Sequence, residues 1–214
     1  MANTNTPFGF QEYYGGSGGV PTFLQSARRI KSNNTTAVFR GDPVMPVIGA
    51  ATGYITQGAA GTTTLAGIFA GCKYFSTAIG RTVWSNYWPG SGATNDIEAY
   101  VIDDPNAQFR VMGGSTTFNI TGTISAMTSS PIGQYAQFNI GTGDTATQQS
   151  GAYLDALNTT VTLPFRVNSL VGLETPGVAG VGNGADPTTA YNHVIVGFNN
   201  EIMRSNGAGP TGIS

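Results

Sequence analysis

Charged side chains are scarce in this sequence. Asp, Glu, Lys and Arg make up only 9% of the 214 residues, whereas an ordinary soluble domain has about 25%. Hydrophobic residues stay at 40%, so neutral polar residues and glycine have replaced the missing charges. A disordered chain is usually charged and poor in aromatics, but this one has 10% aromatics in spaced clusters. The composition predicts a folded chain with little electrostatic protection against association. Long-lived assembly partners would explain such a surface, and so would an extracellular β protein.

Cysteine and histidine are nearly absent. The single cysteine, Cys72, excludes a disulfide within the chain and a CxxC metal site. It lies in the apolar run 67–72, so we expect a buried structural thiol. Acid–base catalysis, nucleophilic triads and zinc sites all rely on histidine or on clustered carboxylates. The only histidine, His193, has no partner motif nearby, and a Gly-x-Ser-x-Gly elbow is missing. We expect His193 to be a strand residue facing solvent or a neighbouring strand, and the chain not to be an enzyme. We expect no catalytic residue, cofactor or metal site.

Two groups of carboxylates allow other interpretations. Asp103 and Asp104 precede a Pro-Asn pair and offer oxygens for calcium, but this order of residues is also ordinary turn chemistry, which we favour. Asp96 and Glu98 would share one face of a strand. That geometry resembles a glycosidase pair, although carboxylates on an exposed strand face are far commoner.

Long apolar runs and long basic runs are also missing. No stretch approaches 18 apolar residues, so we expect no membrane helix and no membrane partner. The first residues show no basic region followed by an apolar core, which predicts synthesis in a cytoplasm without a signal peptide. Nucleic-acid binding needs a broader basic footprint than Arg28, Arg29 and Lys31 offer in a chain of net charge −2. We expect this basic cluster to contact an acidic protein surface, such as the one formed by Asp96, Glu98, Asp103 and Asp104.

Residues 1–35 predict an extended N-terminal arm. The segment carries aromatic side chains without periodicity, among them Phe8, Phe10, Tyr13 and Tyr14, and the run 15–19 is a flexible glycine hinge. These aromatics either pack on the chain's own domain or reach a neighbouring subunit, where aromatic anchors are common. The glycine-rich residues 205–214 predict a flexible C-terminal tail.

Residues 36–204 predict a β domain. Short apolar or β-branched runs alternate with Gly, Pro, Asn and Asp, at intervals typical of sandwiches and barrels. The expected strands are 37–40, 44–48, 53–56, 63–69, 73–76, 81–84, 96–102, 108–111, 116–121, 135–140, 160–167 and 193–199. One short helix is possible near 146–157, with Asp144 or Thr145 as its cap, although Gly151 weakens it. The fold class is therefore all-β: an antiparallel, jelly-roll-like barrel or sandwich with the arm and at most one short helix.

The densest aromatic feature is the run WSNYWP at residues 84–89. Trp84, Tyr87 and Trp88 are able to plug a core between two sheets, stack on sugar rings or anchor a subunit contact. The sequence leaves these three roles open.

Four segments give the chain a family likeness: GDPV at 41–44, GIFAGCKY at 67–74, WSNYWPG at 84–90 and EAYVIDDPN at 98–106. Together they resemble the small virion proteins of tailed bacteriophages that decorate or cement the capsid. The likeness covers roughly residues 40–112 and consists of packing and turn motifs. The simplest members of that family are shorter, so we expect a second β layer or lobe from about residue 113.

The resemblance implies a protein of the capsid surface, made in the host cytoplasm. It would bind the assembled head, bridge neighbouring major capsid subunits and associate with itself as a trimer or dimer. For this role we select as contact residues Phe8, Phe10, Tyr13, Tyr14, Arg28, Arg29, Lys31, Trp84, Tyr87 and Trp88. The alternative is a receptor- or glycan-binding virion β protein that uses the aromatic run at 84–88. A major capsid subunit would need a long spine helix, and the sequence has no helical pattern of that length.

Overall fold

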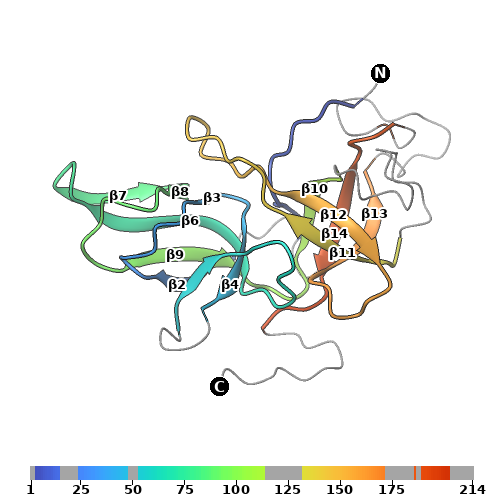
Figure 1. Cartoon of the computed structure of the whole chain (residues 1–214), viewed down its shortest axis with the longest axis horizontal. Helices are drawn as coiled ribbons and strands as arrows, with labels where there is room; N and C mark the ends of the chain where they lie inside the picture. The colour runs from blue at the N-terminus through green and yellow to red at the C-terminus, as the bar shows by residue number, and fades with distance from the viewer. Residues whose placement is uncertain are drawn as a thin grey trace.

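The structure is a computed structural model that describes residues 3–14, 24–47, 53–113, 132–171, 186 and 189–202. Within these ranges it has fourteen β-strands and no helix (Figure 1). Every pairing between named strands is antiparallel. The predicted all-β, sandwich-like class is confirmed, and neither of the two large sheets closes into a barrel.

The first sheet has six strands in the order β1-β10-β14-β13-β11-β12. Their bounds are β1 Gln11–Tyr14, β10 Gln108–Met112, β14 His193–Phe198, β13 Phe165–Leu170, β11 Tyr135–Asn139 and β12 Tyr153–Asn158. Strand β14 lies in the middle, and all six of its residues are buried. The strands after residue 113 therefore form this sheet together with β1 and β10.

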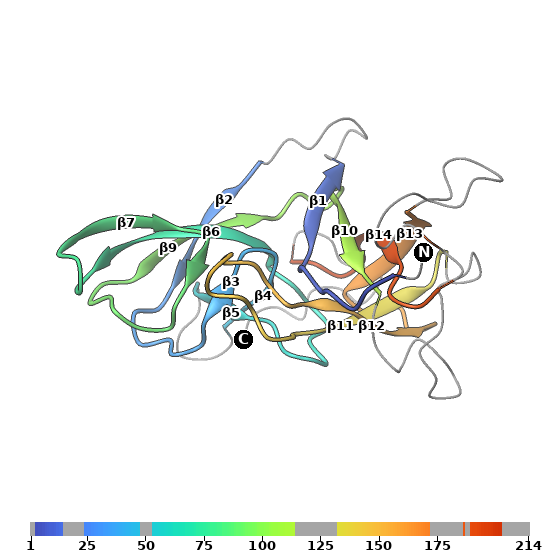
Figure 2. The same ribbon diagram turned by 90° about the horizontal axis from the view of Figure 1, so that it is seen from above.

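The second sheet has the order β2-β9-β6-β4-β5, with β7 paired to the other end of β6. Its strands are β2 Ser26–Ile30, β9 Ile97–Ile102, β6 Gly67–Ser76, β4 Pro43–Pro46, β5 Ile55–Gln57 and β7 Arg81–Ser85. A separate pair joins β3 Val38–Phe39 to β8 Tyr87–Trp88. The two large sheets lie next to each other along the long axis of the molecule (Figures 1 and 2).

The buried side chains form two hydrophobic clusters, and the one under the first sheet also takes in Ile68 of β6 and Ile102 of β9 from the second sheet. Phe109 and Val111 of β10 point into the first cluster, because residues of one strand alternate between its two faces. In the second cluster Ile97, Ala99 and Val101 of β9 do the same. Glu98 and Tyr100 alternate with these buried residues along β9, so they lie on the outer face of the second sheet.

The described residues of the N-terminal segment pack on their own chain, which is one of the two arrangements that the sequence left open for the arm. Strand β1 pairs with β10 in the first sheet, and β2 pairs with β9 in the second. Phe10 is buried in the first cluster and stacks on Phe165 with ring centroids 4.4 Å apart. This segment therefore supplies one edge strand to each sheet of its own chain. Its backbone groups pair with β10 and β9, and its apolar side chains enter the two clusters.

The expected helix at 146–157 is wrong. Residues 145–148 form a turn, and 153–158 form β12. Asp144 does accept a hydrogen bond from the Ala146 amide, as a cap would, but it caps an isolated turn. The chain then extends, because the backbone amides of Ser150 and Ala152 bond to Arg40 and to the Ser150 hydroxyl.

Two predicted strands, 63–69 and 73–76, merge into the ten-residue strand β6. The register with β9 shifts between Phe69 and Gly71, so the residues between the two predicted strands form a β-bulge inside one continuous strand. The predicted strand 116–121, the hinge 15–19 and the tail 205–214 lie outside the described residues.

Candidate binding surface

The aromatic run at 84–88 divides between the surface and the core. Trp84 on β7 is 70% exposed, whereas Trp88 on β8 is fully buried and donates its indole N–H to the Asn34 carbonyl. Tyr87 is half-buried and stacks on Phe39. Trp88 is thus a core plug, which is one of the three roles that the sequence left open for this run.

Trp84 belongs to a cluster on the outer face of the second sheet. Its ring lies parallel to that of Tyr100, with centroids 5.5 Å apart and planes 3° apart. The Lys73 ammonium lies 5.1 Å from the Trp84 ring centroid and 2.8 Å from a Glu98 carboxylate oxygen. The strand register explains the cluster, because Lys73 lies opposite Trp84 on one side and opposite Glu98 on the other.

The charges of this cluster satisfy one another. The hydrogen bond from Lys73 lowers the pKa of Glu98, and the same bond raises the pKa of Lys73. Asp96, the second carboxylate of the possible glycosidase pair, accepts hydrogen bonds from the Tyr54 hydroxyl and the Ser32 amide, and the Tyr54 bond is the main cause of its lowered pKa. Both carboxylates are therefore ionised at neutral pH, and neither has the raised pKa of a general acid.

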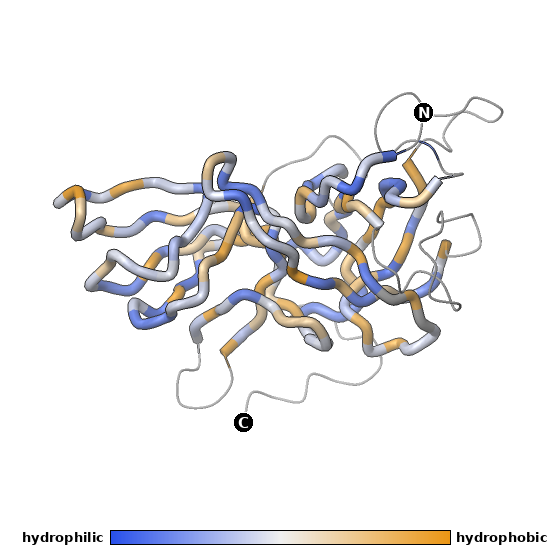
Figure 3. The backbone as a smooth tube through the Cα atoms, turned by 45° about the horizontal axis from the view of Figure 1, so that its top comes forward, coloured by the Kyte–Doolittle hydropathy of each residue, from blue (hydrophilic) through white to orange (hydrophobic). Residues whose placement is uncertain are grey.

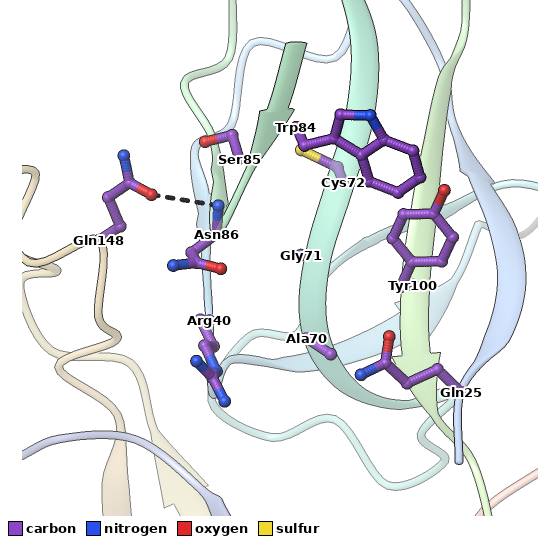
Figure 4. Close-up of a pocket in the computed structure, with 10 residues that line it drawn as sticks. All are labelled: Gln25, Arg40, Ala70, Gly71, Cys72, Trp84, Ser85, Asn86, Tyr100 and Gln148. Atoms are coloured by element: carbon purple, nitrogen blue, oxygen red, sulfur yellow. Dashed lines mark hydrogen bonds between the residues drawn. The ribbon is translucent and has the colours of Figure 1, made fainter. Parts of the chain in front are cut away.

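A cleft of about 420 Å³ lies beside this cluster (Figure 4). Trp84 and Tyr100 line one side, and Arg40, Asn86 and Gln148 line the other. The floor is made of small residues of β6, at 70–72. A second hollow of about 320 Å³ shares Gln25, Arg40 and Ala70 with the cleft, so the two are neighbours along one surface.

Backbone contacts fix the polar side of the cleft. Gln148 has a positive φ of 60°, which is uncommon for a residue with a side chain. Its backbone carbonyl accepts a hydrogen bond from the backbone amide of Arg40. Its side-chain oxygen accepts one from the backbone amide of Asn86 at 3.1 Å. The turn that carries Gln148 is thereby attached to the second sheet.

The basic cluster lies against carboxylates of its own chain. Arg28 forms a 2.7 Å ion pair with Asp103, whose other oxygen accepts a hydrogen bond from Ser26. Arg29 and Lys31 lie near Asp96, where their charges help to lower its pKa. The expected contact with the acidic segment is therefore confirmed for Arg28, which is engaged within the chain.

Asp104, which follows Asp103, belongs to the turn that the sequence predicted. Asp104 accepts a hydrogen bond from the Asn106 amide, and its carbonyl accepts one from the Ala107 amide. No group of three His, Cys, Asp or Glu side chains that could hold a metal ion occurs within the described ranges. Cys72 is buried as predicted, and burial raises the pKa of its thiol to about 12.

The arm aromatics have different surroundings. Phe10 is a core residue, so it follows the first of the two alternatives and packs on its own domain. Phe8 is half-buried, packs edge-on against His193 and lies under the Arg110 guanidinium. Tyr13 is half-buried on β1, and the backbone of Tyr14 lies opposite Gln108.

His193 is the first residue of β14, as expected of a strand residue, and it is buried against the neighbouring strand β10 rather than facing solvent. Its Nδ1 accepts hydrogen bonds from Arg110, at 3.0 Å from Nε and 2.6 Å from Nη2. Burial, reinforced by the Arg110 charge, lowers the pKa of His193 to about 4. The ring is therefore neutral at pH 7 with its proton on Nε2, which has no hydrogen-bond partner among the described residues.

Comparison with protein-family models, with curated proteins and with solved structures gives no match for this chain. In the part of the chain that the structure describes, no helix has the length and apolarity to cross a membrane.

Proposed function

We propose that this protein is a structural component of a tailed-bacteriophage virion, which binds the assembled capsid and cements neighbouring major capsid subunits. The resemblance of residues 40–112 and the scarcity of charge both support this proposal. One structural observation carries it furthest, namely the apolar tip of the β6–β7 hairpin.

The β6–β7 hairpin projects from the end of the molecule away from the first sheet (Figure 1). Its tip is coloured as hydrophobic in Figure 3. Phe75 on β6 is 44% exposed, and Ile79 in the turn is 59% exposed. These two side chains give the hairpin an apolar end.

The tip is held in place from both sides. The Gly80 amide closes the turn on the Ser76 carbonyl. The amide and hydroxyl of Thr77 both donate to the Gly92 carbonyl, at 2.9 and 3.1 Å. A β-bridge also joins Ser76 to Ala93. Because the tip is already ordered, docking does not have to bear the entropy cost of ordering it.

A contact of this kind suits a cement protein. Burying one large apolar side chain contributes about 1.5–3 kcal/mol, and many equivalent sites on a shell multiply a modest contact. A protein that binds the assembled shell, but not the free subunits, stabilises the shell by mass action. The contact should depend weakly on salt, because it rests on apolar groups rather than on ion pairs. Self-association as a trimer or dimer is part of the same proposal.

The test uses particles that lack this chain. We expect them to release their DNA at a lower temperature than complete particles, and we expect added wild-type protein to restore stability at moderate salt. A Phe75→Asp/Ile79→Asp double variant should fold and fail to restore stability. The matched control is Ile132→Asp, which alters a residue 44% exposed near the first sheet and should restore it fully. Equal stability of particles with and without the protein overturns the proposal, and so does full rescue by the double variant.

A further inference from the structure

The cleft beside Trp84 has one aromatic wall and one wall of polar side chains (Figure 4). We propose that this cleft is a binding site for a neutral saccharide. The site is separate from the hairpin tip that carries the proposed function, and it gives the protein a second activity.

The aromatic wall offers a flat apolar surface. Trp84 keeps most of its area exposed although it contacts Tyr100 and Lys73. The parallel Tyr100 ring supports the indole from the neighbouring part of the sheet and extends the apolar surface. A pyranose ring presents an apolar face of C–H groups, and this face fits a flat aromatic platform with a negative π surface.

The opposite wall supplies hydrogen bonds of both kinds. The amides of Asn86 and Gln148 each donate and accept, and the Arg40 guanidinium donates. Gln25 adds a third amide at the end shared with the neighbouring hollow. Sugar hydroxyl groups also donate and accept, so they match amides better than an anionic or a purely apolar ligand would. With Arg40 as the one charged side chain among the lining residues, the cleft lacks the basic groups that a nucleic-acid backbone requires.

The cleft is open and preformed because of its backbone. Gly71 lies on the floor with a φ of +153°, and a Cβ at this position would approach the Ser85 carbonyl oxygen to 3.0 Å. The absence of a side chain lets the backbone of Ser85 and Asn86 lie close to the floor and leaves the space above the floor unfilled. On the polar wall, the left-handed backbone of Gln148 is held by its bonds to Arg40 and Asn86, so the side chain is already in position. The adjoining hollow leaves space for more than one sugar unit.

The chain contains its own reporter of binding. It has two tryptophans, and Trp88 is fully buried, so a fluorescence change on adding sugar reports on Trp84. The probes are the neutral hexasaccharides of glucose (α1,4- and β1,4-linked), mannose, galactose, xylose and N-acetylglucosamine, each titrated to about 10 mM. We expect saturable binding of at least one of them, with a Kd below about 1 mM, confirmed by calorimetry.

Three variants locate the site by calorimetry with the hexasaccharide that binds best. Trp84→Ala should weaken binding at least tenfold, and Trp84→Phe should retain part of it because a ring remains. Gln148→Gly should weaken binding at least threefold; glycine adopts a φ of 60° freely and keeps the backbone bond from Arg40, while the side-chain bond to the Asn86 backbone amide is lost. The control Phe75→Ala removes an exposed ring of the same sheet outside the cleft and should bind like the wild type.

Several results overturn the inference. These are failure of all six hexasaccharides to bind, wild-type affinity in both Trp84→Ala and Gln148→Gly, and tighter binding of a thymidine hexanucleotide than of any sugar. Gln148→Gly should still protect virus particles, because Gln148 lines the cleft and is not one of the expected capsid-contact residues, so failure of the saccharide site and failure of the cement function are distinguishable.

Discussion

The carboxylate of Asp42 accepts a hydrogen bond from the hydroxyl of Ser150, which lies 108 residues further along the chain. Asp42 directly precedes β4 of the second sheet, and Ser150 lies in the segment that leads into β12 of the first. The same carboxylate accepts hydrogen bonds from the Phe39 amide and the Gln57 side chain, and Ser150 in turn accepts one from the Ala152 amide. Asp42 and Ser150 are both buried, so this network joins the two sheets through groups that have no access to water.

Removal of this network should destabilise the whole chain. Asp42→Ala leaves several buried donors without an acceptor, so we expect the free energy of unfolding to fall by about 2–4 kcal/mol. Ser150→Ala should lower it by about 1–3 kcal/mol. Urea denaturation measures both losses. The matched control is Asp144→Ala, which removes an exposed turn carboxylate with two donors of its own and should cost less than about 1 kcal/mol. Equal losses for Asp42→Ala and Asp144→Ala would contradict the structural role of the network.

Gly67, the first residue of β6, has no space for a side chain. Its φ is +134°, and a Cβ would lie 2.5 Å from both the Ile102 carbonyl oxygen and a Val101 methyl. We therefore expect Gly67→Ala to lower the free energy of unfolding by more than about 3 kcal/mol, since a clash adds to backbone strain. Gly80 is the matched control, because its φ is +71° and a Cβ there would meet nothing within 4 Å. Gly80→Ala should cost about 1–2 kcal/mol from strain alone. Thermal and urea unfolding of both variants check the difference.

Much of the fold could be predicted from alternation within strands. The segment 96–102 was expected to be a strand, and β9 occupies Ile97–Ile102 with apolar residues facing the core. Alternation cannot say which strands pair, because pairing depends on contacts far apart in sequence. The placement of β14 between β10 and β13, and of β1 beside β10, therefore had no local signal. The sequence around the turn at 145–148 also resembled a helix start. A residue such as Asp144 accepts hydrogen bonds from nearby amides both in an isolated turn and at the start of a helix.

The candidate site could be predicted only in part. Trp84 and Trp88 are four residues apart, so one continuous strand would place both on the same face. The chain instead changes sheet at Asn86, because β7 pairs with β6 and β8 pairs with β3. Trp88 therefore enters the core while Trp84 stays outside. The role of Tyr100 was detectable from its outward position in β9, but Gln148 reaches the cleft through a turn that no local pattern indicates.

Phe10 tests whether the N-terminal segment belongs to the core. Its ring stacks on Phe165 and packs edge-on against Phe138. Phe10→Ala should lower the free energy of unfolding by about 3–5 kcal/mol, because a large buried side chain leaves a cavity. Phe75→Ala, which removes a ring that is 44% exposed at the hairpin tip, should cost less than Phe10→Ala, at about 1 kcal/mol. Urea unfolding measures both. A loss below 1 kcal/mol for Phe10→Ala would mean that the arm does not pack on its own domain.

His193 should give the protein a distinct response to acid. Its pKa is about 4 in the folded chain, against the usual value of 6.5, because burial and the Arg110 charge disfavour the protonated ring. Between these two values the unfolded chain binds a proton that the folded chain does not. The stabilising contribution is therefore complete above about pH 6.5 and is lost as the pH falls towards 4. Asp42 acts in the opposite direction, because burial raises the pKa of its carboxyl and its contribution is lost as the pH rises above 3.8.

Nuclear magnetic resonance can follow this titration without ambiguity, because the chain has one histidine. We expect the imidazole signals of the folded protein to stay in the neutral form down to about pH 5 and to titrate with a midpoint near 4. A His193→Gln variant removes the histidine and leaves Asp42 in place. The loss of stability between pH 6.5 and 4 should be smaller in this variant than in the wild type, as measured by urea unfolding at each pH. A midpoint near 6.5 in the folded protein, or identical pH profiles for the two proteins, would show that the buried ring is not held neutral by its contacts with Arg110 and the surrounding core.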